Sequence, residues 1–138
     1  MSADTPAYVF DSFAILVLLR NESGADLVQR LLDEVKNGKA RGYLSAVNLA
    51  ELVYIVTRRK GREEALVIVE SARSWGLRIM EVTSDSAVAA GAVKAKYPMS
   101  LADAFCVAGA IDKNAAVVTG DKEMKPVSEV DIIWVGAL

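Results

Sequence analysis

Short apolar runs alternate along the chain with longer segments in which apolar residues recur every three or four positions. This alternation of strand-like and helix-like segments predicts an α/β fold with a mostly parallel sheet. We expect five strands, at residues 7–10, 42–45, 78–82, 115–118 and 131–135. They are short and apolar rather than alternating, which is typical of strands that helices cover on both faces.

Helices are expected between these strands, at residues 12–19, 23–36, 46–58, 62–74, 84–96 and 100–112. Asn37-Gly38 is a helix C-terminal signal, and Ser84 and Ser100 are expected N-caps. Gly61 separates two of the helices, which therefore form a helical hairpin. The pattern predicts a three-layer α/β/α arrangement, and residues 1–138 are expected to form a single domain.

Four acidic residues stand at positions that a purely structural interpretation explains poorly. Asp11 ends the first apolar run and Asp121 follows the fourth, while Glu51 and Asp103 lie inside otherwise apolar helical segments. Sites in open parallel sheets form beyond the carboxyl ends of the strands, where Asp11 and Asp121 are expected. Clustered carboxylates usually hold a divalent cation, so the four are candidate metal ligands and catalytic residues.

Three of these acids also have ordinary structural explanations. Asp11 precedes a helix and is a candidate N-cap. Ser100 and Asp103 have the spacing of a capping box, and an acid early in a helix complements the helix dipole. Gly120-Asp121 is a frequent turn pair. Each explanation is reasonable for its residue alone.

Glu51 resists such an explanation. Its helical neighbours one turn away include no basic residue to pair with it: they are Val47, Asn48, Tyr54 and Ile55. The surrounding residues predict a substantially buried helix, in which an unpaired ionised carboxylate would cost several kcal/mol. Its partner must come from elsewhere in the fold, either a metal or a buried arginine. Asn48 lies on the same face and could orient the carboxylate.

The electrostatics of four neighbouring carboxylates favour a bound cation. Two carboxylates about 4 Å apart repel by about 4 kcal/mol at an effective dielectric constant near 20. Mg²⁺ or Mn²⁺ would supply the counter-charge, because both prefer oxygen ligands. Zinc is disfavoured because the chain has no histidine and a single cysteine, Cys106. Acid–base chemistry by histidine is excluded, because the chain contains none.

Composition narrows the remaining possibilities. The 138 residues are 53% hydrophobic and 25% charged, which is ordinary for a globular protein. The net charge of −2 is not the signature of a nucleic-acid binder, so any phosphate recognition must be local. Cys106 is expected in the core, as are Trp75 and Trp134. The chain shows no signal-peptide pattern and no apolar run long enough to span a bilayer, so we expect a cytoplasmic protein.

Four sequence blocks together resemble a known family. They are Val9-Phe10-Asp11-Ser12-Phe13-Ala14, Leu44-Ser45-Ala46-Val47-Asn48-Leu49-Ala50-Glu51-Leu52, Ser100-Leu101-Ala102-Asp103-Ala104 and Val118-Thr119-Gly120-Asp121-Lys122. In order and spacing they resemble a PIN domain, and the length is similar to that of the VapC-type toxins of prokaryotic toxin–antitoxin pairs. One mild departure is that Phe10 and Phe13 flank Asp11, where smaller aliphatic residues are common in the family.

The resemblance implies a function as well as a PIN-like fold. It implies that Asp11, Glu51, Asp103 and Asp121 form the acidic metal site of a ribonuclease dependent on Mg²⁺ or Mn²⁺. It also implies a homodimer and, in toxin members, inhibition by a cognate antitoxin protein. The supporting polar positions that match the family are Ser12, Asn48 and Thr119.

Basic and apolar residues predict the remaining contacts. Lys122 and Lys125, beside Asp121, are the best-placed candidates to hold RNA phosphates. Arg58 and Arg59 belong to the densest basic run, although a solvated hairpin tip explains that run more simply. The hairpin of residues 46–74 carries more apolar side chains than one buried face needs, which independently predicts a homodimer.

Three other functions compete with a toxin ribonuclease. A receiver domain also has an acidic Mg²⁺ pocket, but it needs paired acids after its first strand and an aspartate after a middle strand. Here Asp11 stands alone, and the middle strands end in Ser45 and Val82. A PIN-like module that only binds partners, or a nuclease that processes RNA without being a toxin, stays open.

Overall fold

A fully parallel five-stranded sheet forms the centre of the molecule. The computed structural model describes residues 5–136. The strands are β1 (Ala7–Phe10), β2 (Arg41–Ser45), β3 (Arg78–Met80), β4 (Ala116–Thr119) and β5 (Ile132–Trp134), in the order β3-β2-β1-β4-β5. Each neighbouring pair is parallel, so all carboxyl ends lie at one edge of the sheet.

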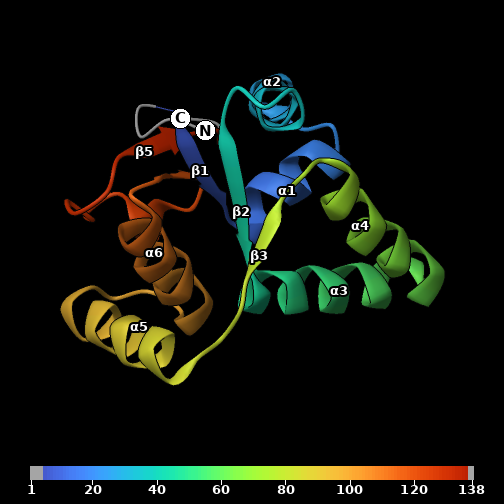
Figure 1. Cartoon of the computed structure of the whole chain (residues 1–138). Helices are drawn as coiled ribbons and strands as arrows, with labels where there is room; N and C mark the ends of the chain where they lie inside the picture. Colours follow the sequence, from blue (N-terminus) through green and yellow to red (C-terminus); the bar gives the residue numbers. More distant parts are fainter. Residues whose placement is uncertain (1–4, 137–138) are drawn as a thin grey trace.

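Helices cover both faces of the sheet, as Figure 1 shows. One side carries α1, α2, α3 and α4, and the other carries α5 and α6. The helices are α1 (Ser12–Leu19), α2 (Ala25–Lys36), α3 (Ala46–Lys60), α4 (Arg62–Ser74), α5 (Ser84–Lys96) and α6 (Leu101–Lys113), with a 3₁₀ turn, η1 (Lys122–Met124). The predicted α/β/α fold and the helical hairpin, α3 and α4, are therefore confirmed.

Two apolar cores result from the alternation of side chains along the strands. Phe10 and Val118 face the core under α1–α4, whereas Val9 and Val117 face the core under α5 and α6. All four side chains are completely buried. Burying a side chain of this size contributes about 1.5–3 kcal/mol, so the central strands are held firmly from both sides.

Two tryptophans and the cysteine were expected in the core. Cys106 is fully buried in the core under α5 and α6, as predicted. Trp75 and Trp134 are only partly buried, and Trp75 packs on the edge of the opposite core. Within residues 5–136, no helix combines the length and apolar character that crossing a membrane would require.

Some predicted boundaries differ from the structure for local reasons. Helix α2 begins at Ala25 rather than at residue 23, because Gly24 before it has a φ of 100°. A Cβ at Gly24 would lie 1.8 Å from the carbonyl oxygen of Val135, so this turn requires glycine. The N-cap of α5 is Thr83 rather than Ser84, because Thr83 and Ser86 form a reciprocal capping box.

The lengths of other elements shift by one or two residues. Helix α3 continues to Lys60, two residues further than predicted. Strand β3 ends at Met80, two residues earlier than predicted. Turn η1 was not predicted, because three residues are too few to give a helical period.

Candidate active site

The four predicted acids approach one another at the carboxyl edge of the sheet. Asp11 directly follows β1 and Asp121 follows β4, while Asp103 lies in the first turn of α6 and Glu51 in α3. The carboxylate of Asp11 is close enough to interact electrostatically with Asp121 and Glu51, and that of Asp103 with Asp121 and Asp11. The parallel register of β1 with β2 and β4 produces this convergence, because it aligns their carboxyl ends.

Asp11 has both a capping role and a place in the cluster. Its side chain is 1% exposed. Its Oδ1 accepts a hydrogen bond from the backbone N–H of Ala14 at 2.8 Å, so it caps α1, and its Oδ2 accepts one from the Thr119 hydroxyl. Burial raises the pKa of Asp11 to about 7, although these two hydrogen bonds act in the opposite direction.

Thr119 joins the ends of β1 and β4. Its hydroxyl donates to Asp11 and accepts a hydrogen bond from the backbone N–H of Asp121 at 3.0 Å. Asp121 in turn accepts at Oδ1 from the backbone N–H of Glu123 at 2.9 Å and caps η1. The completely buried Thr119 therefore fixes the relative positions of Asp11 and Asp121.

Asp103 is the least satisfied carboxylate of the cluster. The Ser100 side chain accepts a hydrogen bond from the backbone N–H of Asp103 at 3.1 Å, as the predicted cap requires. Asp103 is only 7% exposed, and its Oδ2 has no hydrogen-bond partner among residues 5–136. Burial and the nearby Asp121 carboxylate raise the pKa of Asp103 to about 7. Because the capping hydrogen bond uses the backbone N–H of Asp103, the side-chain carboxylate stays available to the site.

Glu51 differs from the prediction of a substantially buried helix. Helix α3 buries a single stripe, Asn48, Leu52 and Val56, and Glu51 beside it is partly exposed. Its Oε1 accepts hydrogen bonds from the Ser12 hydroxyl at 2.5 Å and from Asn48 Nδ2 at 3.2 Å. Both partners are neutral. The hydrogen bond from Asn48 agrees with the predicted role of this residue in orienting the Glu51 carboxylate. Because water can solvate the partly exposed Glu51 carboxylate, this residue needs a cationic partner less than the sequence predicted.

Glu123 is a carboxylate of this cluster that sequence reasoning missed. One carboxylate oxygen from each of Asp103, Asp121 and Glu123 lies within 4.8 Å of the other two. Turn η1 returns the chain so that Glu123, two residues after Asp121, reaches the same side. The Asp-Lys-Glu sequence at residues 121–123 was the available signal, but its meaning depends on a turn that the apolar pattern does not reveal.

The donor set fits a hard divalent cation. It consists of carboxylate oxygens, it includes a buried oxygen without a partner, and two of its acids have pKa values raised by burial and like charge. Mg²⁺ and Mn²⁺ prefer such oxygen ligands. Asp103, Asp121 and Glu123 have oxygens close enough to share one ion, with Glu123 at the exposed margin, and the carboxylates of Asp11 and Glu51 lie beside them.

Comparison with known families agrees with this architecture. The model of the PIN domain family matches residues 8–130. The chain belongs to the PIN domain family. No curated protein sequence gives a significant match.

Solved PIN-domain structures share the fold. VapBC2 from Rickettsia felis, bound to a promoter DNA fragment, has a TM-score of 0.74 at 19% identity, covering 92% of this chain and 97% of that chain. VapC20 from Mycobacterium tuberculosis, described as a toxin that cleaves the sarcin-ricin loop, has a TM-score of 0.69 at 18% identity, with coverages of 90% and 98%. A toxin–antitoxin complex from Klebsiella pneumoniae has a TM-score of 0.68 at 15% identity, with coverages of 89% and 94%.

The four basic residues predicted to hold RNA occupy different surroundings in this PIN domain. Lys122 lines a groove together with Asp121. The Lys125 ammonium lies 4.8 Å from the centre of the Trp134 ring, and the Arg58 guanidinium lies 5.8 Å from that of Tyr54. Arg59 lines a hollow between α1, α3 and α4. Lys122 is therefore the predicted basic residue that the structure places directly beside the carboxylates.

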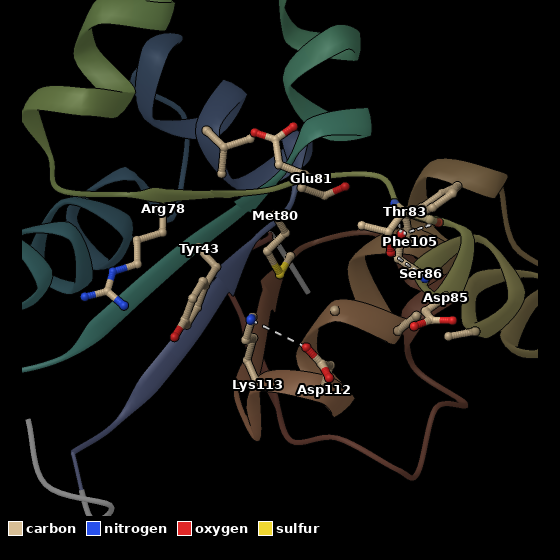
Figure 2. A pocket seen from close by; sticks show the side chains of 15 residues that line it. Tyr43, Arg78, Met80, Glu81, Thr83, Asp85, Ser86, Phe105, Asp112 and Lys113 are labelled. Atoms are coloured by element: carbon tan, nitrogen blue, oxygen red, sulfur yellow. Dashed lines mark hydrogen bonds and ion pairs between the residues drawn. The ribbon is translucent and has the colours of Figure 1, made fainter.

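A second hollow, of about 570 Å³, lies beside β3 on the α5 and α6 side of the sheet. Figure 2 shows Met80 and Lys113 projecting into it. The Lys113 ammonium lies 3.5 Å from the Asp112 carboxylate and 5.6 Å from the centre of the Tyr43 ring. None of the four predicted acids lines this hollow, and Asp112, one of its own acids, is paired with Lys113. It is therefore a weaker candidate than the acidic cluster.

Proposed function

We propose that this PIN domain hydrolyses RNA phosphodiester bonds with a divalent cation, Mg²⁺ or Mn²⁺, and acts as the toxin of a toxin–antitoxin pair. The observation that carries the proposal is the convergence of Asp11, Glu51, Asp103 and Asp121, which have no ion-pair partner among residues 5–136. The family membership and the fold shared with VapC20, described as a toxin that cleaves the sarcin-ricin loop, add support.

The chain positions its carboxylates before any substrate arrives. Thr119 and the backbone of Ala14 fix Asp11, Thr119 also fixes the backbone at Asp121, and Ser12 with Asn48 fixes Glu51. When bound, a divalent cation supplies Lewis-acid activation of water and neutralisation of phosphate charge. Among the carboxylate oxygens of residues 5–136, Asp103 Oδ2 is buried without a hydrogen-bond partner and is free to bind an ion or to take up a proton.

Proton transfer in this site must use carboxylates and water, because the chain has no histidine. Without a cation, burial raises the pKa of Asp11 and of Asp103 to about 7, so these two acids hold protons near neutral pH. The neighbouring cation would bias both groups toward the ionised form. Asp11 and Asp103 would therefore lose their protons when the cation binds.

Cleavage of RNA by the purified protein tests the proposal. We expect cleavage with Mg²⁺ or Mn²⁺, its loss with EDTA, and a loss on the order of a thousandfold in Asp103→Asn. Glu129→Gln is the matched control, because Glu129 lies at the opposite end of the sheet and should leave the rate unchanged. Cleavage that survives thorough chelation, or that Asp103→Asn leaves intact, would refute the metal mechanism.

A partner protein is proposed to cover the apolar hollow between α1, α3 and α4. Leu16, Leu19, Ile55 and Val67 contribute to its lining. Its charged lining is mainly basic: three basic residues and one acid, namely Arg20, Arg59, Lys60 and Glu64. This surface fits an amphipathic helix with an apolar face and an acidic border. The Klebsiella pneumoniae relative was solved as a toxin–antitoxin complex, which favours an antitoxin as the occupant.

The toxin role makes a prediction that a purely RNA-processing enzyme does not. Expression in a bacterial host should arrest growth, and co-expression of the partner protein encoded beside it should relieve the arrest. Growth that is unaffected by an active enzyme would favour RNA processing instead. The homodimer stays a prediction, which light scattering at micromolar concentration would test.

A further inference from the structure

Phe13 is an exposed aromatic residue at the margin of the acidic cluster. It lies in the first turn of α1, two residues after Asp11 and directly after Ser12, whose hydroxyl holds Glu51. Its neighbours Ala14 and Ile15 are buried, but Phe13 itself is 39% exposed. The helix therefore presents an aromatic surface to solvent at the place where the site opens.

A groove of about 580 Å³ runs beside this ring and reaches the acidic cluster. Phe13, Gly120, Asp121 and Lys122 all line it, so one wall carries an aromatic ring, one acid of the site and one cation. Glu22 also lines the groove; its Oε1 lies 3.9 Å from Arg20 Nη1 in an exposed ion pair, and its carboxylate can still accept hydrogen bonds from a ligand. These groups suit the parts of a nucleotide. The ring can stack on a base, the cation can bind a phosphate, and the carboxylate can accept hydrogen bonds from the edge of the base.

Gly120 sets the position of the ring relative to the site. A Cβ at Gly120 would lie 2.2 Å from Phe13 Cε1 and 2.9 Å from the Cα of Gly136. The ring can therefore rest on this stretch of backbone only because residue 120 has no side chain. Since Gly120 stands between Thr119 and Asp121, the ring packs on backbone directly beside an acid of the site.

We propose that Phe13 is a stacking platform for one base of the RNA substrate, belonging to a nucleotide next to the cleaved phosphodiester. This inference rests on the proposed ribonuclease function. Proteins recognise single-stranded RNA mainly by stacking unpaired bases on aromatic side chains. Lys122 in the same groove contacts the backbone phosphate of that nucleotide, and Glu22 favours bases that carry amino or imino donors.

The surface proposed for the partner protein is a different one. The hollow between α1, α3 and α4 is lined from α1 by Leu16, Leu19 and Arg20, whereas Phe13 and Val17 line the groove at Asp121. The aromatic ring is thus associated with the acidic site rather than with the apolar hollow. This arrangement favours RNA over a protein segment as its occupant.

An abasic scan of a cleaved single-stranded RNA tests the stacking. With the wild type, loss of the base at one position beside the cleaved bond should raise KM about tenfold. In Phe13→Leu, KM for intact RNA should already be raised about tenfold. Removing the same base should then raise the KM of this variant no further, and its kcat should change little. Phe13→Trp should behave as the wild type. Ile111→Ala, which removes a similarly exposed apolar side chain on α6, should also match the wild type.

A second measurement does not depend on cleavage. A 2-aminopurine placed at successive positions of a short single-stranded RNA should be quenched at one position on binding, in the presence of Mg²⁺. The quenching should disappear in Phe13→Leu and persist in Phe13→Trp, and circular dichroism should show equal folding. No quenching with the wild type would overturn the proposal.

The outcomes separate this inference from the proposed function. If the wild type cleaves RNA but Phe13→Leu responds to every missing base as the wild type does, the stacking role is wrong and the ribonuclease stands. If the wild type cleaves no RNA, the ribonuclease proposal is wrong, and the quenching measurement decides the stacking role alone. If Phe13→Leu weakens only the binding of the partner protein, the ring belongs to a protein interface and the proposal is overturned.

Discussion

Carboxylates at the two ends of the sheet have opposite surroundings and opposite pKa shifts. Near the amino ends of the strands, Glu129 accepts a hydrogen bond from the Tyr97 hydroxyl, and the Lys96 ammonium lies 3.4 Å away. The Tyr97 hydrogen bond, with help from the Lys96 charge, lowers the pKa of Glu129. At the carboxyl ends, Asp11 and Asp103 are buried beside other acids, and their pKa values rise to about 7.

This difference separates a carboxylate that stabilises the fold from carboxylates held for a ligand. Glu129 has a cation as well as a hydroxyl donor, so its ionised form is already stabilised. Asp11 also has a hydroxyl donor, Thr119, but its charged neighbours are Asp121 and Glu51. The site therefore keeps negative charge that only an added cation or a proton can relieve.

The matched hydroxyls at the two ends give the largest expected contrast. Thr119→Val removes the donor to Asp11 and the acceptor for the Asp121 backbone, so metal affinity or cleavage should fall about 10–100-fold. Tyr97→Phe removes the donor to Glu129 and should leave cleavage unchanged. Both changes should lower the free energy of unfolding, Thr119→Val by about 1–2 kcal/mol, as measured by urea denaturation.

Thr119→Ser keeps the hydroxyl and is the control for shape. It should recover most of the activity that Thr119→Val loses. Equal activity losses in Thr119→Val and Tyr97→Phe would show that the hydroxyls act only through stability, and the contrast between the two ends would disappear.

The pH dependence of stability should differ between the two kinds of carboxylate. Asp11 and Asp103 have folded pKa values of about 7 against 3.8 ordinarily, so they contribute stability that is complete below pH 3.8 and lost as pH rises toward 7. With EDTA, the melting temperature should therefore be higher at pH 5 than at pH 8. The lowered pKa of Glu129 contributes stability that is lost only at more acidic pH, so it adds no slope in this window.

Adding Mg²⁺ or Mn²⁺ should reverse this trend. Metal binding requires ionised carboxylates, so the ion should raise the melting temperature by about 5–10 °C at pH 8 when present at about a hundred times its Kd, and much less at pH 5. Asp103→Asn should weaken both the pH slope and the response to metal. A melting temperature that rises from pH 5 to pH 8 in EDTA would contradict the raised pKa values.

The sequence was most informative where periodicity and end signals agree. Helix α1 and strand β1 have their predicted limits, because an apolar strand passes directly into a helix that Asp11 caps. The placement of Asp11 and Asp121 at one edge followed from their position after apolar runs, since parallel strands share their carboxyl edge. Local pattern and global topology point to the same arrangement at these residues.

Other properties of the site depend on contacts that no local pattern contains. The partial exposure of Glu51 follows from how α3 packs, and its apolar sequence had predicted deeper burial. Glu123 joins the cluster through a 3₁₀ turn too short to leave a periodic signal. The link from Thr119 to Asp11 spans 108 positions of the chain, so only the resemblance to a family pointed to Thr119.

The smallest expected effect concerns Glu123, at the exposed margin of the cluster. Its carboxylate lies within 4.8 Å of those of Asp103 and Asp121, but it is open to solvent, which screens its charge. Glu123→Gln should therefore weaken metal binding only about two- to fivefold, as measured by calorimetry at pH 8, with no loss of stability in EDTA. Glu63→Gln, an exposed acid of α4, should leave the affinity unchanged. A loss as large as that of Asp103→Asn would make Glu123 a direct ligand, and the division between buried ligands and an exposed margin would then be wrong.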